Sequence, residues 1–265
     1  MTPEKIQGWY DRFRYYRRPP SVADIQRWIG RFQDGDRELA SKVLDRVLLI
    51  SEDDIQRGYR EALEAIPGWH RTRARRRGEW VICGFGGAGE SGGEMLRKFR
   101  EANRLAGKRQ DYLFDTITHL ASRRLTEADT VIMVDDFSGT GEQITSYWPT
   151  HAELIGGARA FLVLTAATRD ALARLIQLPT LSEILVDYIA ERSDNVFSAA
   201  NTEFTNSEKE RLLQYCQIAD ARRPKGFGEC GLTIVLSHKT PNNSLPILHA
   251  NKKDWRGLFP RYLNV

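Results

Sequence analysis

Apolar residues recur at the spacing of an α-helix through the start of the chain, with polar residues between them. Pro-Pro at 19–20 interrupts this pattern, and Pro-Gly at 67–68 ends it. Ser51 followed by Asp54 has the spacing of a capping box. The pattern therefore predicts a helical N-terminal subdomain over residues 1–70. Its apolar stripes are Ile25, Trp28, Ile29 and Phe32, then Leu39, Val43, Leu44 and Val47, then Ile55, Tyr59 and Leu63.

From residue 79 onward, short continuous apolar runs alternate with helical segments. Strands that are apolar on both faces are typical of a parallel sheet covered by helices on both sides. We therefore predict an α/β fold for residues 71–265, with a mostly parallel sheet and flanking helices. Ligands of such sheets bind at the carboxyl ends of the strands, here after Cys83 and Val134. We expect strands at residues 80–83, 130–134, 158–164, 183–189 and 232–236, and helices at 91–105, 111–124, 140–147, 169–176 and 206–219.

The composition is that of an ordinary globular protein of 265 residues, 41% hydrophobic and 28% charged. No apolar run approaches the roughly 18 residues of a membrane helix, and the first residues lack the apolar core of a signal peptide. Three widely spaced cysteines fit neither a disulfide framework nor a zinc site. We therefore expect a cytoplasmic protein with no membrane partner.

The basic excess is unevenly distributed along the sequence. The net charge is +4, and the first 78 residues alone carry 17 lysines and arginines against 12 acidic residues. A dense arginine run within them is a candidate for binding nucleic-acid phosphates, with Trp69, Trp80 and Tyr59 nearby for base stacking. A solvated linker is the alternative interpretation. The run consists of Arg71, Arg73, Arg75, Arg76 and Arg77.

The segment VIMVDDFSGTG, residues 131–141, carries the strongest chemical signal. An apolar strand delivers two carboxylates, Asp135 and Asp136, to its carboxyl end, and a loop of small and hydroxyl residues then opens a helix. Backbone N–H groups at a helix start, with the hydroxyls of Ser138 and Thr140, form a pocket suited to a phosphate. Carboxylates beside it would bind ribose hydroxyls or Mg²⁺. The segment therefore predicts a ribose 5-phosphate site; a loop that merely ends a strand is the alternative.

At these residues the sequence resembles the phosphoribosyltransferase family, whose signature is a hydrophobic strand, two acidic residues, three variable residues and Thr-Gly. The resemblance implies a type I phosphoribosyltransferase-like fold in which Asp135 and Asp136 hold the ribose hydroxyls and serve as catalytic residues, with Mg²⁺ bound at the same pair. It also implies that residues 137–143 surround the 5-phosphate. These residues are Phe137, Ser138, Gly139, Thr140, Gly141, Glu142 and Gln143, and Gln143 departs from the small hydroxyl residue often found at its position.

A glycine-rich loop, GFGGAGESGG, follows the first expected strand of the sheet at residues 84–93. Its Gly-x-Gly-x-x-Gly spacing also matches a dinucleotide fingerprint, but that fingerprint needs a second acidic strand about 20 residues later, where this sequence is helix and turn. The resemblance to phosphoribosyltransferases implies instead that the loop binds diphosphate. The residues implied are Glu90, Ser91, Gly92 and Gly93, and Lys108 and Arg109 are basic candidates for the same diphosphate.

The C-terminal region resembles a narrower group, the phosphoribosyltransferase-like proteins of bacterial conflict and antiphage systems, including retron operons. The stretch PNNSLPIL, residues 241–248, is the most distinctive part of this resemblance. It implies an effector that works with a reverse transcriptase and its DNA or RNA, or with another defence protein. His238, Asn242 and Asn243 are candidates for contacting a base edge. The alternative is that these three residues lock a local turn.

Two functional hypotheses follow from these features. The first is an enzyme that binds phosphoribosyl diphosphate or a nucleotide with Mg²⁺ and transfers the phosphoribosyl group or cleaves the N-glycosidic bond. The second is a non-catalytic module that senses a nucleotide or a 5′-phosphate and docks nucleic acid or protein. The short segment between the two loops, and Glu90 beside the expected diphosphate, favour the second. An oligomeric assembly is compatible with either hypothesis.

Overall fold

The computed structural model describes residues 2–86 and 91–262. It divides the chain into two compact units: the first combines Met1–Glu52 with Glu191–Val265, and the second is Asp53–Ala190. This division differs from the expected one at residue 70, because residues from 191 onward pack with the N-terminal helices and share their core. No helix within the described ranges is long and apolar enough to cross a membrane.

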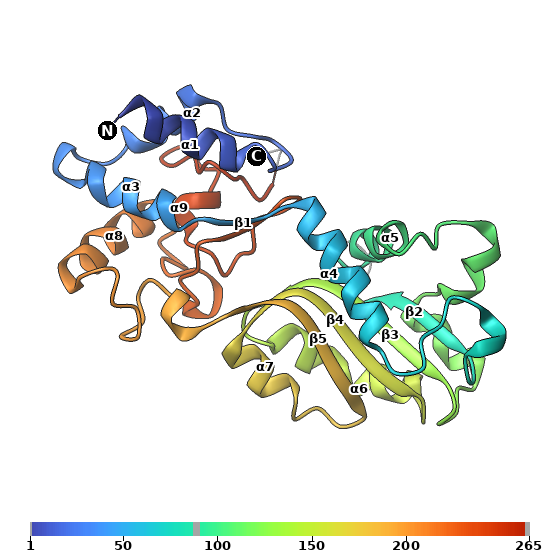
Figure 1. Ribbon diagram of the computed structural model, residues 1–265. Helices are drawn as coiled ribbons and strands as arrows, with labels where there is room; N and C mark the ends of the chain where they lie inside the picture. The colour runs from blue at the N-terminus through green and yellow to red at the C-terminus, as the bar shows by residue number, and fades with distance from the viewer. Residues whose placement is uncertain (1, 87–90, 263–265) are drawn as a thin grey trace. The chain divides into compact units, whose positions relative to one another are not determined.

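The second unit contains a four-stranded parallel sheet of order β2-β3-β4-β5 (Figure 1). Helices α4 and α5 cover one face of this sheet, and α6 and α7 cover the other. This arrangement confirms the α/β fold class with a mostly parallel sheet and flanking helices. The strands are β2 (Trp80–Gly84), β3 (Thr130–Ser138), β4 (Arg159–Thr168) and β5 (Leu181–Ala190), and the helices are α4 (Glu52–Ala65), α5 (Gly92–Ala102), α6 (Glu142–Ile155) and α7 (Arg169–Leu175).

The interior of the sheet follows from its apolar strands. The inner residues of β3 and β4 are fully buried, and β3 alternates side chains between the two helical layers. Val131 and Met133 pack toward Ile144 and Trp148 of α6 in one hydrophobic cluster. On the other side, the ring of Tyr59 in α4 lies 5.4 Å from that of Phe99 in α5. Helices therefore cover both faces of the inner strands β3 and β4, and polar groups follow the apolar residues at the end of β3.

The segment between α5 and β3 differs from the expected helix at 111–124. It forms two 3₁₀ helices, η3 (Lys108–Leu113) and η4 (Ile117–Arg123). Phe114 between them is extended and forms a parallel bridge with Ile82 of β2, which interrupts the helix. The carboxylate of Asp115 then accepts a hydrogen bond from the backbone N–H of Thr116, an alternative to a continuous helical turn.

The first unit is built around an aromatic core. Trp28 and Trp255 both donate their indole N–H to the carbonyl oxygen of Ile247, at 2.8 Å. A two-stranded parallel sheet joins the two parts of the chain, because β1 pairs with β6. The expected strand at 232–236 therefore lies outside the four-stranded sheet. The elements are α1 (Pro3–Phe13), α2 (Val22–Ile29), α3 (Arg37–Arg46), β1 (Leu48–Ile50), α8 (Asn206–Ala219), β6 (Ile234–Leu236) and α9 (Pro246–His249).

Candidate functional site

The acidic pair lies near the carboxyl end of β3, which is an inner strand of the four-stranded sheet. Asp135 and Asp136 are only 3% and 8% exposed. Each carboxylate accepts a hydrogen bond from the next backbone N–H: Asp135 Oδ1 from Asp136 N at 2.9 Å, and Asp136 Oδ1 from Phe137 N at 2.7 Å. These local bonds hold both side chains at the strand end, where ligands of parallel sheets bind.

Ser91 brings the glycine-rich loop to the acidic pair. Its hydroxyl lies 2.7 Å from Asp135 Oδ1 and 3.0 Å from Asp136 Oδ1. Since a hydroxyl carries one proton, it donates to one carboxylate at a time. Burial, and secondarily the charge of Asp136, raise the pKa of Asp135 well above its ordinary value. Without a ligand, Asp135 therefore retains its proton to higher pH than an ordinary carboxyl group.

The two glycines that frame this loop permit a close approach of backbone to backbone. A Cβ on Gly84 would lie 2.3 Å from the carbonyl oxygen of Gly92, and a Cβ on Gly92 would lie 1.9 Å from that of Phe85. Only glycine fits at either position without a backbone shift. The chain therefore returns directly over the end of β2, which places Ser91 against the carboxylates of β3.

Tyr59 of α4 contacts the backbone of the acidic pair. The sequence pattern indicated only a place on the apolar stripe of a helix and a stacking role beside the arginine run. The side chain is 1% exposed, and its hydroxyl donates to the backbone carbonyl of Asp135 at 3.1 Å. The same hydroxyl accepts a bond from the Thr165 hydroxyl of β4 at 3.3 Å. A tyrosine on a core-facing stripe gives no sequence signal for this role, because the bond depends on how α4 crosses the sheet.

The loop from Phe137 to Gln143 leads from β3 into α6. Gly139 accepts a 2.6 Å hydrogen bond at its carbonyl oxygen from the hydroxyl of Thr168, which also caps α7. Gly141 adopts a left-handed conformation with φ of 74°, which favours glycine. Glu142 donates its backbone N–H to the Thr140 hydroxyl at 3.3 Å. The N-cap Gly141 offers no side chain to the first turn of this 14-residue helix. Anions bind at such helix starts.

The other residues expected at the diphosphate are distributed along the same unit. Gly93 lies in the first turn of α5, with open space around a Cβ built on it. Lys108 and Arg109 are exposed in η3. Within the described ranges, no hydrogen bond or ion pair joins either of them to the acidic pair. Glu90 lies outside the described residues. The diphosphate assignment therefore stays a prediction, with Ser91 as its best-placed member.

The three candidate base contacts belong to the first unit, where Asn242 and Asn243 form local bonds. His238 is buried, and Asn243 donates its side-chain N–H to the carbonyl of Phe227 at 3.0 Å. The carbonyl oxygen of Asn242 accepts from the N–H of Phe227 at 2.7 Å. These contacts support the alternative of a locked turn. A role in base binding stays a prediction.

The arginine run lies in the second unit, where most of its side chains contact neighbouring residues. Arg71 donates to the carbonyl of Arg104 at 2.7 Å, and Arg73 lies over the ring of Tyr112 at 4.8 Å. Arg76 is buried, 4.9 Å from the ring of Trp69, and bonds the hydroxyl of Tyr112. Arg75 contacts His70 at 3.2 Å, whereas Arg77 is exposed.

The donor set at the acidic pair is compatible with Mg²⁺ but not with a closed metal centre. No group of three or more histidine, cysteine, aspartate or glutamate side chains in the described ranges is arranged to hold a metal ion. Mg²⁺ usually takes one or two carboxylates, and substrate phosphates and water complete its coordination. Asp135 and Asp136 supply those carboxylates beside the loop that opens α6, so the residues fit a metal that arrives with its substrate.

Comparison with known proteins adds a family to this geometry. The family model described as PRTase-CE matches residues 25–261. No curated protein matches the chain. Among solved structures, the AQ2163 protein from Aquifex aeolicus is similar at 14% identity over 63% of this chain and 84% of that one, with a TM-score of 0.35. Orotate phosphoribosyltransferase from Mycobacterium tuberculosis H37Rv, in complex with 5-phospho-α-D-ribosyl 1-diphosphate, is similar at 14% identity over 71% and 96%, with a TM-score of 0.29.

Proposed function

Because the chain belongs to the PRTase-CE family, we propose that it binds a phosphoribosyl ligand at the acidic pair and transfers or cleaves at the anomeric carbon. The observation that carries this proposal is the convergence of Asp135, Asp136 and Ser91 beside the start of α6. This combination offers hydrogen-bond acceptors for ribose hydroxyls and backbone donors for a phosphate within one short segment.

The residues act in two ways in this proposal. The carboxylates of Asp135 and Asp136 accept hydrogen bonds from the ribose 2′- and 3′-hydroxyls and stabilise positive charge that develops on the ring. The N–H groups at the start of α6, with the Thr140 hydroxyl, bind the 5-phosphate. Ser91 gives up its bond to one carboxylate as the ribose arrives and is then free to bind diphosphate. Mg²⁺, held at the acidic pair, would neutralise charge on the diphosphate.

A non-catalytic sensor of a nucleotide or 5′-phosphate is the second candidate. The positions of Lys108 and Arg109 favour this candidate, because neither basic side chain contacts the acidic pair in the described residues. A leaving diphosphate needs cationic groups near its oxygens, and their absence would leave binding intact while slowing turnover.

The narrower assignment concerns biological context. We propose that the protein is an effector of a bacterial antiphage system such as a retron, with a reverse transcriptase and its nucleic acid as partners. The support is the resemblance of the C-terminal region, most distinctively residues 241–248, to that group. Loss of phage protection on Asp135→Asn substitution, with the protein still expressed, is the expected outcome in plaque assays.

Calorimetry with phosphoribosyl diphosphate and MgCl₂ tests the proposed ligand. We expect saturable binding by the wild type, loss of binding by Asp135→Asn and Asp136→Asn, and unchanged binding by Glu64→Gln, an exposed substitution in the same unit. Binding that survives in both aspartate variants would refute the site. Diphosphate release under the same conditions separates the two candidates, because a sensor binds without releasing it.

A further inference from the structure

The fold redistributes the basic charge of the chain. The first unit, residues 1–52 with 191–265, carries 21 lysines and arginines against 16 acidic residues, a net of +5. The second unit, residues 53–190, carries 18 against 19, a net of −1. The arginine run at 71–77 therefore belongs to the near-neutral unit, and the basic excess belongs to the other one.

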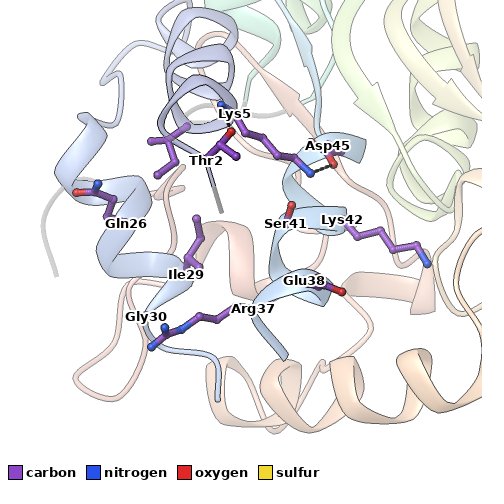
Figure 2. A pocket seen from close by; sticks show the side chains of 11 residues that line it. Thr2, Lys5, Gln26, Ile29, Gly30, Arg37, Glu38, Ser41, Lys42 and Asp45 are labelled. Carbon is purple, nitrogen blue, oxygen red and sulfur yellow. Dashed lines mark hydrogen bonds and ion pairs between the residues drawn. The ribbon is translucent and has the colours of Figure 1, made fainter. Parts of the chain in front are cut away.

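In one pocket of the first unit, the basic side chains are paired with acidic ones. It has a volume of about 750 Å³ and is lined by side chains of α1, α2 and α3 (Figure 2). Its three basic side chains each pair with an acid: Lys5 with Asp45 at 2.8 Å, Arg37 with Asp34 at 2.7 Å, and Lys42 with Glu208 at 2.9 Å. An anion would have to displace these internal partners, so this pocket is not an anion site.

A second pocket of the same unit has the opposite balance. Its volume is about 320 Å³, and it is lined by four arginines and one acid, Asp24, which pairs with Arg27. Arg31 donates to the carbonyl of Asp254 at 3.5 Å. Arg18 and Arg256 are exposed and form no ion pair with any carboxylate in residues 2–86 and 91–262. The pocket therefore presents uncompensated positive charge over the buried ring of Trp28.

Two exposed tyrosines lie in the segments that border this pocket. Tyr15 is 50% exposed and Tyr262 is 61% exposed, and an arginine lies over each ring: Arg14 at 5.0 Å and Arg261 at 5.6 Å. The segments 14–18 and 260–262 are adjacent, because Arg17 donates to the carbonyl of Arg261 at 2.8 Å. We call the whole the arginine–tyrosine surface; it comprises Arg14, Tyr15, Arg17, Arg18, Arg31, Arg256, Arg261 and Tyr262.

We propose that the arginine–tyrosine surface binds single-stranded nucleic acid. Arg18 and Arg256, which form no ion pair with a described carboxylate, supply contacts to backbone phosphates, and neutralisation of those phosphates releases counterions. Exposed aromatic rings beside them are the groups on which unpaired bases stack. A duplex would use the arginines but leave the rings without a base face, and so would an acidic protein segment. The rings are therefore the observation that favours a single strand.

Fluorescence anisotropy of the full chain, with a labelled oligonucleotide of about 20 nucleotides at low salt, tests the proposal. Arg18→Ala/Arg256→Ala should weaken binding by about tenfold or more and reduce the salt slope by about one per lost phosphate contact. The charge-matched control, Lys5→Ala/Arg37→Ala, removes two cations of the self-neutralised pocket and should change affinity less than about twofold. Tyr15→Ala and Tyr262→Ala should each weaken single-strand binding several-fold while leaving duplex binding unchanged.

Three outcomes would overturn the proposal. The first is an equal loss in the Arg18/Arg256 variant and its control, which would indicate a general charge effect. The second is a loss that follows Arg73→Ala/Arg75→Ala instead, which would assign binding to the arginine run. The third is binding of poly-glutamate but of no oligonucleotide, which would assign the surface to an acidic protein partner. Thermal unfolding of each variant, followed by circular dichroism, reports that it remains folded.

Discussion

The carboxyl group of Asp135 is buried, and the neighbouring Asp136 adds a second unfavourable charge. Both conditions raise its pKa in the folded state above its unfolded value. A carboxyl group with a raised folded-state pKa contributes its full stability below the unfolded pKa and loses it as the pH rises through the folded pKa. Ionisation of Asp135 at neutral and alkaline pH therefore destabilises the unliganded protein.

Asp135→Asn removes the ionisation and keeps a group of similar size that can accept the Ser91 hydroxyl bond. We expect the Tm of the variant to exceed that of the wild type at pH 8 by about 2 °C or more, and the difference to shrink toward pH 5. Thermal melts across that pH range measure it. Glu64→Gln, on the exposed side of α4, should show no such trend. A variant less stable at pH 8 than at pH 5, relative to the wild type, would contradict this electrostatic account.

Helix α5 begins with two glycines that meet different surroundings. A Cβ on Gly92 would lie 1.9 Å from a backbone oxygen, whereas one on Gly93 meets nothing within 4 Å. We expect Gly92→Ala to destabilise the protein by at least about 2 kcal/mol, because backbone must move. Gly93→Ala should stay within about 1 kcal/mol of the wild type, on the stabilising side. Urea unfolding of the two variants is a matched test, and equal effects would show that the loop does not approach β2 so closely.

The hydroxyl of Tyr59 links helix α4 to the sheet, because it bridges the carbonyl of Asp135 and the hydroxyl of Thr165. Tyr59→Phe keeps the ring in the core and removes both of these bonds. We expect a loss of about 1–2 kcal/mol in the free energy of unfolding and weaker binding of phosphoribosyl diphosphate. If stability falls while ligand affinity is unchanged, Tyr59 supports the fold alone and does not position the acidic pair.

Elements with strong local patterns could be predicted from the sequence. The helix expected at 206–219 is confirmed as α8, where Thr205 and Glu208 form a capping box, and the strands expected at 130–134 and 158–164 are confirmed as β3 and β4. Family membership likewise confirms the phosphoribosyltransferase-like resemblance carried by the acidic-pair motif. Strand β6 lies within the strand expected at 232–236, whereas its three-residue partner β1 gave no such signal, because it is too short for a period and pairs with a segment far along the chain.

Contacts between elements could not be predicted from local sequence patterns. The bond from Tyr59 to Asp135, and the bond from Thr168 to Gly139, each depend on how one element crosses another. The same holds for charge. Along the sequence, the basic excess lies in the first 78 residues. In the folded protein, residues 1–52 and 191–265 form one unit, and this unit carries the excess. The surface that we propose for nucleic acid is therefore the arginine–tyrosine surface, whereas the sequence pattern indicated the arginine run.

At the scale of the whole molecule, the two proposed ligands draw on different units. The phosphoribosyl site uses residues of Asp53–Ala190, and the arginine–tyrosine surface uses residues of the other unit. In hydrogen–deuterium exchange of the full chain, we therefore expect phosphoribosyl diphosphate with Mg²⁺ to slow amides around residues 135–145. An oligonucleotide should slow amides around residues 14–31 and 251–262. Ligand contacts and local ordering reduce the opening that exchange requires.

Addition of both ligands should give the sum of the two protection patterns if the sites are energetically independent. Coupling would appear as a change in affinity that is equal in both directions, because linkage between binding sites is reciprocal. Titration of oligonucleotide with and without saturating phosphoribosyl diphosphate measures it, and Asp135→Asn serves as the control that cannot respond. Equal affinities would establish two independent sites. A shift in the wild type, absent from Asp135→Asn, would instead show that occupancy of the acidic pair is communicated to the arginine–tyrosine surface.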